Sequence, residues 1–207
     1  MLSTRRAITF MDAALASAEA TNVSTPLKLA ATLFVMVATA AAAQISVPLP
    51  FTPVPFTFQP LVVLVGGAVL GPELGMLSQI CYLAAGFAGL PVFAASPDLP
   101  QGMARLLGPT GGYLMAYPFA AFATGFLARR AFDRRYLTSV VAMTIGLAIV
   151  FMGGITWLTL FAPGAEGRSL QAALRVGFYP FVVADLVKIC LAAAVMPVAW
   201  RLLGRLD

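Results

Sequence analysis

Two charged residues, Asp185 and Lys188, lie inside the last long apolar run of the sequence. An ionised side chain at the centre of a membrane helix costs roughly 2.5–3.5 kcal/mol on insertion scales. Residues three apart share a face of a helix, so this carboxylate and this ammonium group can partly neutralise each other. The pair either only fixes helix packing or marks a ligand site. We expect a ligand site, because intramembrane charges are usually functional.

Histidine is absent from the 207 residues. The commonest general base and metal ligand is therefore missing, which excludes hydrolases that depend on Ser/His chemistry. The apolar runs also lack paired carboxylates for acid–base or metal chemistry. We therefore expect neither an enzyme nor a bound metal or cofactor.

The connection Val47–Pro60 contains five prolines in the segment VPLPFTPVPFTFQP. Proline fixes φ and biases the preceding residue toward an extended conformation, so this segment cannot be helical. It is either a rigid link between helices or a lid over a pocket. Thr52, Thr57 and Gln59 favour a lid, because they offer hydrogen-bonding groups to a buried ligand.

A second polar connection, Pro91–Gly112, contains Asp98, Gln101 and Arg105. It ends in a glycine-rich turn, where Thr110 is a predicted helix cap and free N–H groups would favour an anion. The turn does not match a Walker A loop, because the Lys-Ser or Lys-Thr pair is missing. Close helix packing would explain its glycines equally well.

The composition places all these residues in a membrane protein. Hydrophobic residues make up 60% of the chain and charged residues 10%, whereas soluble domains contain about 25% charged residues. Five apolar runs reach the length of a spanning helix, about 17–25 residues, and the run Leu61–Leu70 is shorter. The five are Leu27–Gln44, Leu74–Leu90, Gly111–Ala128, Tyr136–Ala162 and Phe178–Leu203. We predict an all-α integral membrane protein with six transmembrane helices.

The basic residues test this topology. With six crossings, nine fall on the side of the termini and three on the other, with Lys188 inside the last helix. The nine are Arg5, Arg6, Lys28, Arg129, Arg130, Arg134, Arg135, Arg201 and Arg205, and the three are Arg105, Arg168 and Arg175. This bias predicts that both termini are cytoplasmic, and such scattered charges disfavour binding to nucleic acid. Residues 1–25 would be a cytoplasmic tail or interfacial helix, and residues 26–207 a single transmembrane domain.

Small residues four apart, Ala38 and Ala42, occur in the first apolar run. Such spacing lets another helix approach closely. Packing inside the chain explains it as well as a partner contact does, and from spacing alone internal packing is favoured.

Together these segments resemble the BioY family, the biotin-specific S components of energy-coupling factor (ECF) transporters. The likeness covers roughly residues 27 to 203, in order. It is carried by Pro48–Pro55 with Gln59, Gly67–Pro72, Gly89–Ala94, Leu106–Leu114, and Pro180–Phe181 followed by Asp185 and Lys188. Two positions depart from the family pattern: Glu73 replaces a basic residue, and Val183–Ala184 replaces Pro-Gly before the aspartate.

The resemblance implies an S-component fold in the bacterial cytoplasmic (inner) membrane, with biotin bound beneath the first and third connections. It also implies that Ala38 and Ala42 contact the transmembrane coupling subunit, and that two cytoplasmic ATPase subunits complete a transporter. The sequence contains no nucleotide-binding motif of its own. Uptake by the chain alone, and a homo-oligomer, are compatible with the resemblance.

Charge balance is consistent with biotin, which has one carboxylate and a neutral ureido ring. Asp185, Lys188 and Arg105 sum to +1, which one carboxylate would neutralise. We expect Asp185 to accept hydrogen bonds from the ureido N–H groups, while Lys188 or Arg105 meets the ligand's acceptors. The sequence leaves open which cation takes the carboxylate. Further expected contacts are Gln59, Gln79, Tyr82, Phe93 and Tyr113.

The alternative function is a proton-coupled secondary carrier of a small anionic metabolite, with Asp185 as the titrating group. Uptake abolished by a protonophore, yet indifferent to loss of an ATPase subunit, would favour this alternative.

Overall fold

The structure is a computed structural model that describes residues 9–14, 24–96, 100–161 and 169–203. Six helices match the six predicted apolar runs, so the predicted all-α membrane fold is confirmed. They are α2 (Ser24–Gln44), α3 (Gln59–Leu70), α4 (Pro72–Phe87), α6 (Gly111–Arg129), α7 (Tyr136–Leu160) and α9 (Tyr179–Leu203). Three short helices are also present: α1 (Phe10–Ala14), α5 (Met103–Leu107) and α8 (Leu170–Gly177).

By length and composition, α2, α7 and α9 are each long and apolar enough to cross a membrane, and α3 is a shorter apolar helix. Proline accounts for the start of α3 and of α4, because Pro60 and Pro72 occupy first-turn positions that need no N–H donor. Gly71 separates the two helices with φ +84°, a conformation that residues with a side chain rarely adopt.

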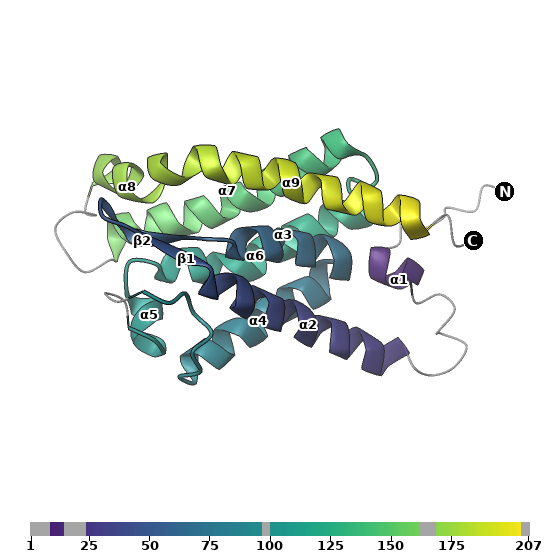
Figure 1. The fold of residues 1–207 in the computed structure, drawn as a ribbon, viewed down its shortest axis with the longest axis horizontal. Coiled ribbons are helices and arrows are strands. Elements are labelled where there is room, and N and C mark those ends of the chain that lie inside the picture. The colour runs from purple at the N-terminus through teal and green to yellow at the C-terminus, as the bar shows by residue number, and fades with distance from the viewer. Residues whose placement is uncertain (1–8, 15–23, 97–99, 162–168, 204–207) are drawn as a thin grey trace.

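The bundle has two chemically different ends (Figure 1). The α1 end, on the right, holds α1, the start of α2 and the last turns of α9. The hairpin end, on the left, holds the two strands, α5 and α8. The predicted tail within residues 1–25 is described only at 9–14 and 24–25, and Arg5, Arg6, Arg168 and Arg205 lie outside the described residues.

The proline-rich connection is extended, as predicted, but it also forms a hairpin that the sequence analysis missed. Strand β1 (Ser46–Leu49) pairs antiparallel with β2 (Thr52–Thr57), and Val47 lies opposite Phe56. Thr52 fastens the hairpin to α8, because its Oγ1 donates a 2.6 Å hydrogen bond to the carbonyl of Val176. The hairpin is therefore held by its backbone pairing and by this side-chain contact with α8.

Glycines let α3, α4 and α6 pack at backbone distance. A Cβ added at Gly67 would lie 2.4 Å from the carbonyl oxygen of Ala121, and one at Gly125 would lie 2.4 Å from the carbonyl carbon of Gly71. Neither neighbour is a flexible side chain that could move aside. In membranes, such small-residue contacts provide the van der Waals packing that holds helices together.

We predict that Gly125→Ala destabilises the bundle by about 1–3 kcal/mol, the usual range for overpacking. This overlap outweighs the gain in helix propensity, which is about 1 kcal/mol for this exchange. Gly108→Ala is the matched control, because the nearest atom to its added Cβ is 3.4 Å away. Thermal unfolding in detergent measures the effect, and equal midpoints for the two variants would contradict it.

Candidate ligand-binding site

A cavity lies at the hairpin end, bounded by β2, α6, α7 and α9 and by the connection that carries α5. Its walls are mainly apolar, with Leu114 on α6, Leu147, Val150 and Phe151 on α7, and Phe181 on α9. A few polar side chains converge on it from different elements, as is usual for small-molecule sites. They are Thr57, Gln59, Arg105, Thr110, Tyr113, Tyr117, Asp185 and Lys188.

The ion pair is formed inside this cavity. Lys188 Nζ donates to Asp185 Oδ1 at 2.7 Å and to the carbonyl of Thr57 at 2.6 Å. The ring of Phe56 lies beneath the ammonium group, 3.6 Å from Nζ to the ring centroid. Both charged residues are 6% exposed. The pair is thus desolvated and close to neutral, and it joins α9 to the end of β2.

Arg105 has a different environment. It is 1% exposed and projects from α5 into the cavity. One nitrogen, Nη2, donates to the carbonyl of Ala94, whereas Nε and Nη1 are buried with no hydrogen-bond partner in the part of the chain that the structure describes. Burial lowers the pKa of the guanidinium group from its ordinary value, since it penalises the charged form. The cavity therefore presents unpaired cationic donors.

Gln59 and Tyr82 form a chain of hydrogen bonds at the cavity. Gln59 Nε2 donates to the hydroxyl of Tyr82 at 2.6 Å, and this hydroxyl donates to the carbonyl of Val92 at 3.1 Å. Thr57 Oγ1 donates to Gln59 Oε1 at 3.2 Å. Gln59 lines the cavity, but Tyr82 does not. The predicted tyrosine thus stands behind the cavity and fixes the amide in front of it.

Two aromatic walls depend on glycines behind them. A Cβ at Gly154 would lie 2.2 Å from the ring of Tyr113, and a Cβ at Gly86 would lie 2.1 Å from the ring of Phe93. Tyr113 is also held at its far end, since its hydroxyl donates to the carbonyl of Gly177 at 2.8 Å. Both predicted aromatics therefore line the cavity in fixed positions.

The sequence analysis missed several lining residues. Tyr117 follows Tyr113 by four positions, so the helical period of α6 would have placed both on one face. Phe181 precedes Asp185 by four positions, so the helical period of α9 would have placed it on the face of the ion pair. Phe151 belongs to a long apolar run, and no sequence signal distinguishes a cavity-facing phenylalanine there from a lipid-facing one.

Other predicted residues lie elsewhere. Gln79 does not line the cavity: it is buried against α2, where its Nε2 donates to Thr39 Oγ1 at 3.2 Å. Gln101 donates to the carbonyl of Phe93 and does not line the cavity either. Thr110 precedes α6 as predicted, but its hydroxyl makes no capping bond and is buried without a partner among the described residues. Asp98 lies outside the described residues.

The two small residues of α2, Ala38 and Ala42, differ in their exposure. Ala42 is 7% exposed and buried within the chain, and its contact with a partner stays a prediction. Ala38 is half-buried and lines an apolar groove between α2 and α3. Of these two residues, Ala38 is the one that is accessible to another helix in this conformation.

Comparison with known proteins identifies the family. A sequence model of the BioY family matches residues 14–205. The chain belongs to the BioY family. The resemblance inferred from the proline-rich and glycine-rich segments is therefore confirmed.

Similar proteins agree with this membership. The chain is 41% identical over 166 residues to the probable biotin transporter BioY of Pyrococcus horikoshii, covering 80% of this chain and 90% of that protein. It is 40% identical over 154 residues to the biotin transporter BioY of Thermotoga maritima, covering 74% and 83%. Its fold matches a crystal structure of the S-component for biotin from an ECF-type ABC transporter, with a TM-score of 0.76, 25% identity, and coverage of 87% and 94%. The predicted S-component fold is thereby confirmed.

We predict that Lys188→Met destabilises this BioY protein by about 3–5 kcal/mol, because it leaves the Asp185 carboxylate buried without its cation. The double variant Asp185→Leu/Lys188→Met removes both charges and should recover much of that loss. Thermal unfolding in detergent measures both. A double variant no more stable than Lys188→Met would show that the cost comes from lost packing and not from the isolated charge.

Proposed function

We propose that this chain binds biotin with high affinity in the cavity at the hairpin end, as the substrate-binding S component of an ATP-driven ECF transporter. The observation that carries the proposal is the cavity itself. It contains both the balanced ion pair of Asp185 and Lys188 and the guanidinium of Arg105, whose charge is not balanced in this way within the described chain. Biotin has matching groups, with a neutral ureido ring at one end and a carboxylate at the other. Membership of the BioY family supports this ligand. The chain acts by binding and uptake and not as an enzyme.

The carboxylate of biotin is assigned to Arg105. Lys188 already has a carboxylate at 2.7 Å and a carbonyl at 2.6 Å, so its charge is balanced. Arg105 has two buried nitrogens without partners in the described chain, and burial disfavours its charge. A ligand carboxylate would supply the missing acceptors and the missing counter-charge through charge-assisted hydrogen bonds.

The ureido ring is assigned to the floor formed by Asp185, Lys188 and Gln59. Oδ1 of Asp185 accepts from Lys188, which leaves Oδ2 to accept from a ureido N–H. The third N–H of Lys188 and the second N–H of Gln59 remain to donate to the ureido carbonyl. The apolar remainder of biotin would then lie between the walls of α6 and α7.

The direction of transport follows from the charge distribution. Among the described residues, Lys28 lies near the start of α2, Arg201 lies in the last turn of α9, and Arg129, Arg130, Arg134 and Arg135 lie at the end of α6 and in its connection to α7, which Asp133 joins to Trp200 of α9. These segments lie at the α1 end, whereas α5 and α8, which carry Arg105 and Arg175, lie at the hairpin end (Figure 1). By the positive-inside rule, the α1 end would face the cytoplasm and the cavity would open outward. The transmembrane coupling subunit and two ATPase subunits would supply the energy, in a bacterial inner membrane.

Biotin and biotin amide together test the assignment of the two cations. We predict that Arg105→Gln weakens binding of biotin by more than tenfold but changes binding of the neutral amide little. Loss of a desolvated charged contact costs about 2–5 kcal/mol, and 1.4 kcal/mol is a factor of ten. Asp185→Asn should weaken both ligands, because both retain the ureido ring.

The measurement is the dissociation constant of each ligand for each purified variant. Leu107→Gln is a control on α5, since this residue is 54% exposed and does not line the cavity. Equal losses of biotin and amide affinity in Arg105→Gln would overturn the assignment of the carboxylate. Unchanged biotin affinity in both site variants would overturn the binding site.

A further inference from the structure

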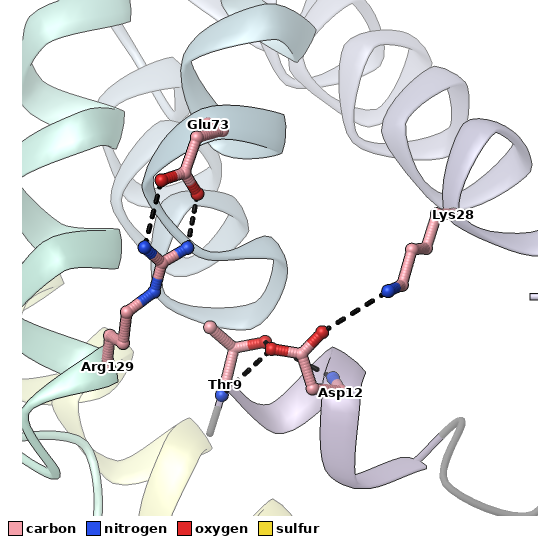
Figure 2. A network of polar contacts seen from close by, with 5 residues as sticks. All are labelled: Thr9, Asp12, Lys28, Glu73 and Arg129. Atoms are coloured by element: carbon pink, nitrogen blue, oxygen red, sulfur yellow. Dashed lines mark hydrogen bonds and ion pairs between the residues drawn. The ribbon is translucent and has the colours of Figure 1, made fainter. Parts of the chain in front are cut away.

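The α1 segment begins before the region that matches the BioY family model, which starts at residue 14. It nevertheless forms an ordered turn. Thr9 Oγ1 donates to Asp12 Oδ2 at 2.8 Å, and the amide of Asp12 donates to Thr9 Oγ1 at 3.2 Å (Figure 2). This reciprocal pattern caps the start of the helix. Residues 9–14 therefore form a defined structure of their own.

This turn contacts three helices of the bundle. Met11, 9% exposed, packs on Val35 of α2 and Leu70 of α3. Phe10 meets the ring of Trp200 on α9 edge to face, with 5.2 Å between the centroids. These contacts bury the apolar side of α1 at the α1 end of the bundle.

Trp200 is itself held in place. Its Nε1 donates to Asp133 Oδ2 at 2.6 Å, and the guanidinium of Arg134 lies 3.4 Å from the centroid of its indole ring. Asp133 is 1% exposed. The surface that receives Phe10 is therefore built from both α9 and the connection between α6 and α7.

The helix packs beside one end of an apolar groove. The groove runs between α2 and α3, and every lining residue is apolar, including the small Ala31, Ala38 and Gly66. Val35 and Leu70, on which Met11 packs, are lining residues as well, and Ala31 packs against the same cluster. Small residues allow a second helix to approach closely in a membrane. Met11 thus contacts residues at one end of a surface that another helix could approach closely.

The docking of α1 is weak enough to be reversed. A five-residue helix is not stable on its own and depends on its contacts. Its ion pair joins Lys28 Nζ to Asp12 Oδ1 at 3.5 Å, and the side chains are 31% and 40% exposed (Figure 2). Pairs this exposed contribute little and are screened by salt.

We propose that α1 is a reversible clip that covers the cytoplasmic end of the groove between α2 and α3 and must leave before a partner helix can fill the groove. The partner helix belongs to the transmembrane coupling subunit, which is the part of the inference that rests on the proposed function. The clip itself needs only the contacts of Met11, Phe10 and Asp12. In this way α1 competes with the helix of the coupling subunit for the groove.

The accessibility of Leu70→Cys tests the clip. Leu70 is 4% exposed and lies beneath Met11 at the end of α3. In a Cys81→Ser/Cys190→Ser background, Met11→Asp should speed labelling of this cysteine by a water-soluble maleimide at least fivefold. Ala13→Asp is the control, because it adds the same charge to α1 at a residue outside the cluster around Met11. Equal rates in the two variants would overturn the clip.

A matched pair of variants tests the ion pair between Lys28 and Asp12. Lys28→Glu should raise the labelling rate, whereas Lys28→Arg should leave it near the parent value, because only the first removes the attraction to Asp12. Both changes lie on α2 and leave the side chains of Thr9 and Asp12 themselves in place. A cysteine at Leu107, at the hairpin end, should label equally in all variants and reports that the fold is intact.

Assembly provides the functional readout. Co-expressed with the coupling and ATPase subunits, Met11→Asp should copurify at least twofold more of them than Ala13→Asp does. Faster labelling without increased assembly would refute the competition for the groove. Biotin binding is measured on the same samples. If none of the variants binds biotin while labelling behaves as expected, the proposed function fails and the clip stands.

Discussion

The buried ion pair of Asp185 and Lys188 determines how the hairpin end is built. Two charges inside an apolar bundle are tolerated only when they are paired and hydrogen-bonded, because desolvation is costly. Lys188 meets this requirement by reaching across to the carbonyl of Thr57, and Phe56 covers its ammonium group. The hairpin, the floor of the cavity and α9 therefore form one unit. Thr52 adds a contact to α8 on the other side, so the lid is held at both edges.

The charged groups that the structure describes in the cavity fall into two kinds, a balanced ion pair and a cation with unpaired donors. The ion pair is balanced, whereas Arg105 in the same cavity is buried with unpaired donors among the described residues. Aromatic and aliphatic side chains from α6, α7 and α9 line the rest of the cavity. A ligand with a neutral hydrogen-bonding ring, an apolar middle and an anionic end complements these groups, and the proposed ligand, biotin, has all three. At the other end of the bundle, Glu73 departs from the family pattern but is paired with Arg129, through a 2.9 Å bond from Nη1 to Oε1 (Figure 2).

The site and the fold were most predictable from the sequence where a residue type is rare in its surroundings or restricts the backbone. Asp185 and Lys188 stand out because charge is rare in apolar runs, and the prolines forced the connection after α2 to be extended. Hairpin pairing was missed because it depends on register across a two-residue turn, which proline content does not specify. Gln79 was misplaced because a polar residue in a helix can satisfy itself against a neighbouring helix, here through Thr39, as well as against a ligand. The burial of Ala42 could not be predicted, because the spacing of small residues does not distinguish an internal contact from an external one.

The central claim is that this cavity holds biotin, and the most direct measurement is the identity of the molecule that the protein retains. The chain is purified from cells grown with biotin, and the molecules released on denaturation are identified and quantified by mass spectrometry. Near-stoichiometric biotin from the parent chain, strongly reduced in Asp185→Asn of equal thermal stability, is the predicted result. A folded parent chain that retains a different molecule, or that binds no added biotin, would contradict the account.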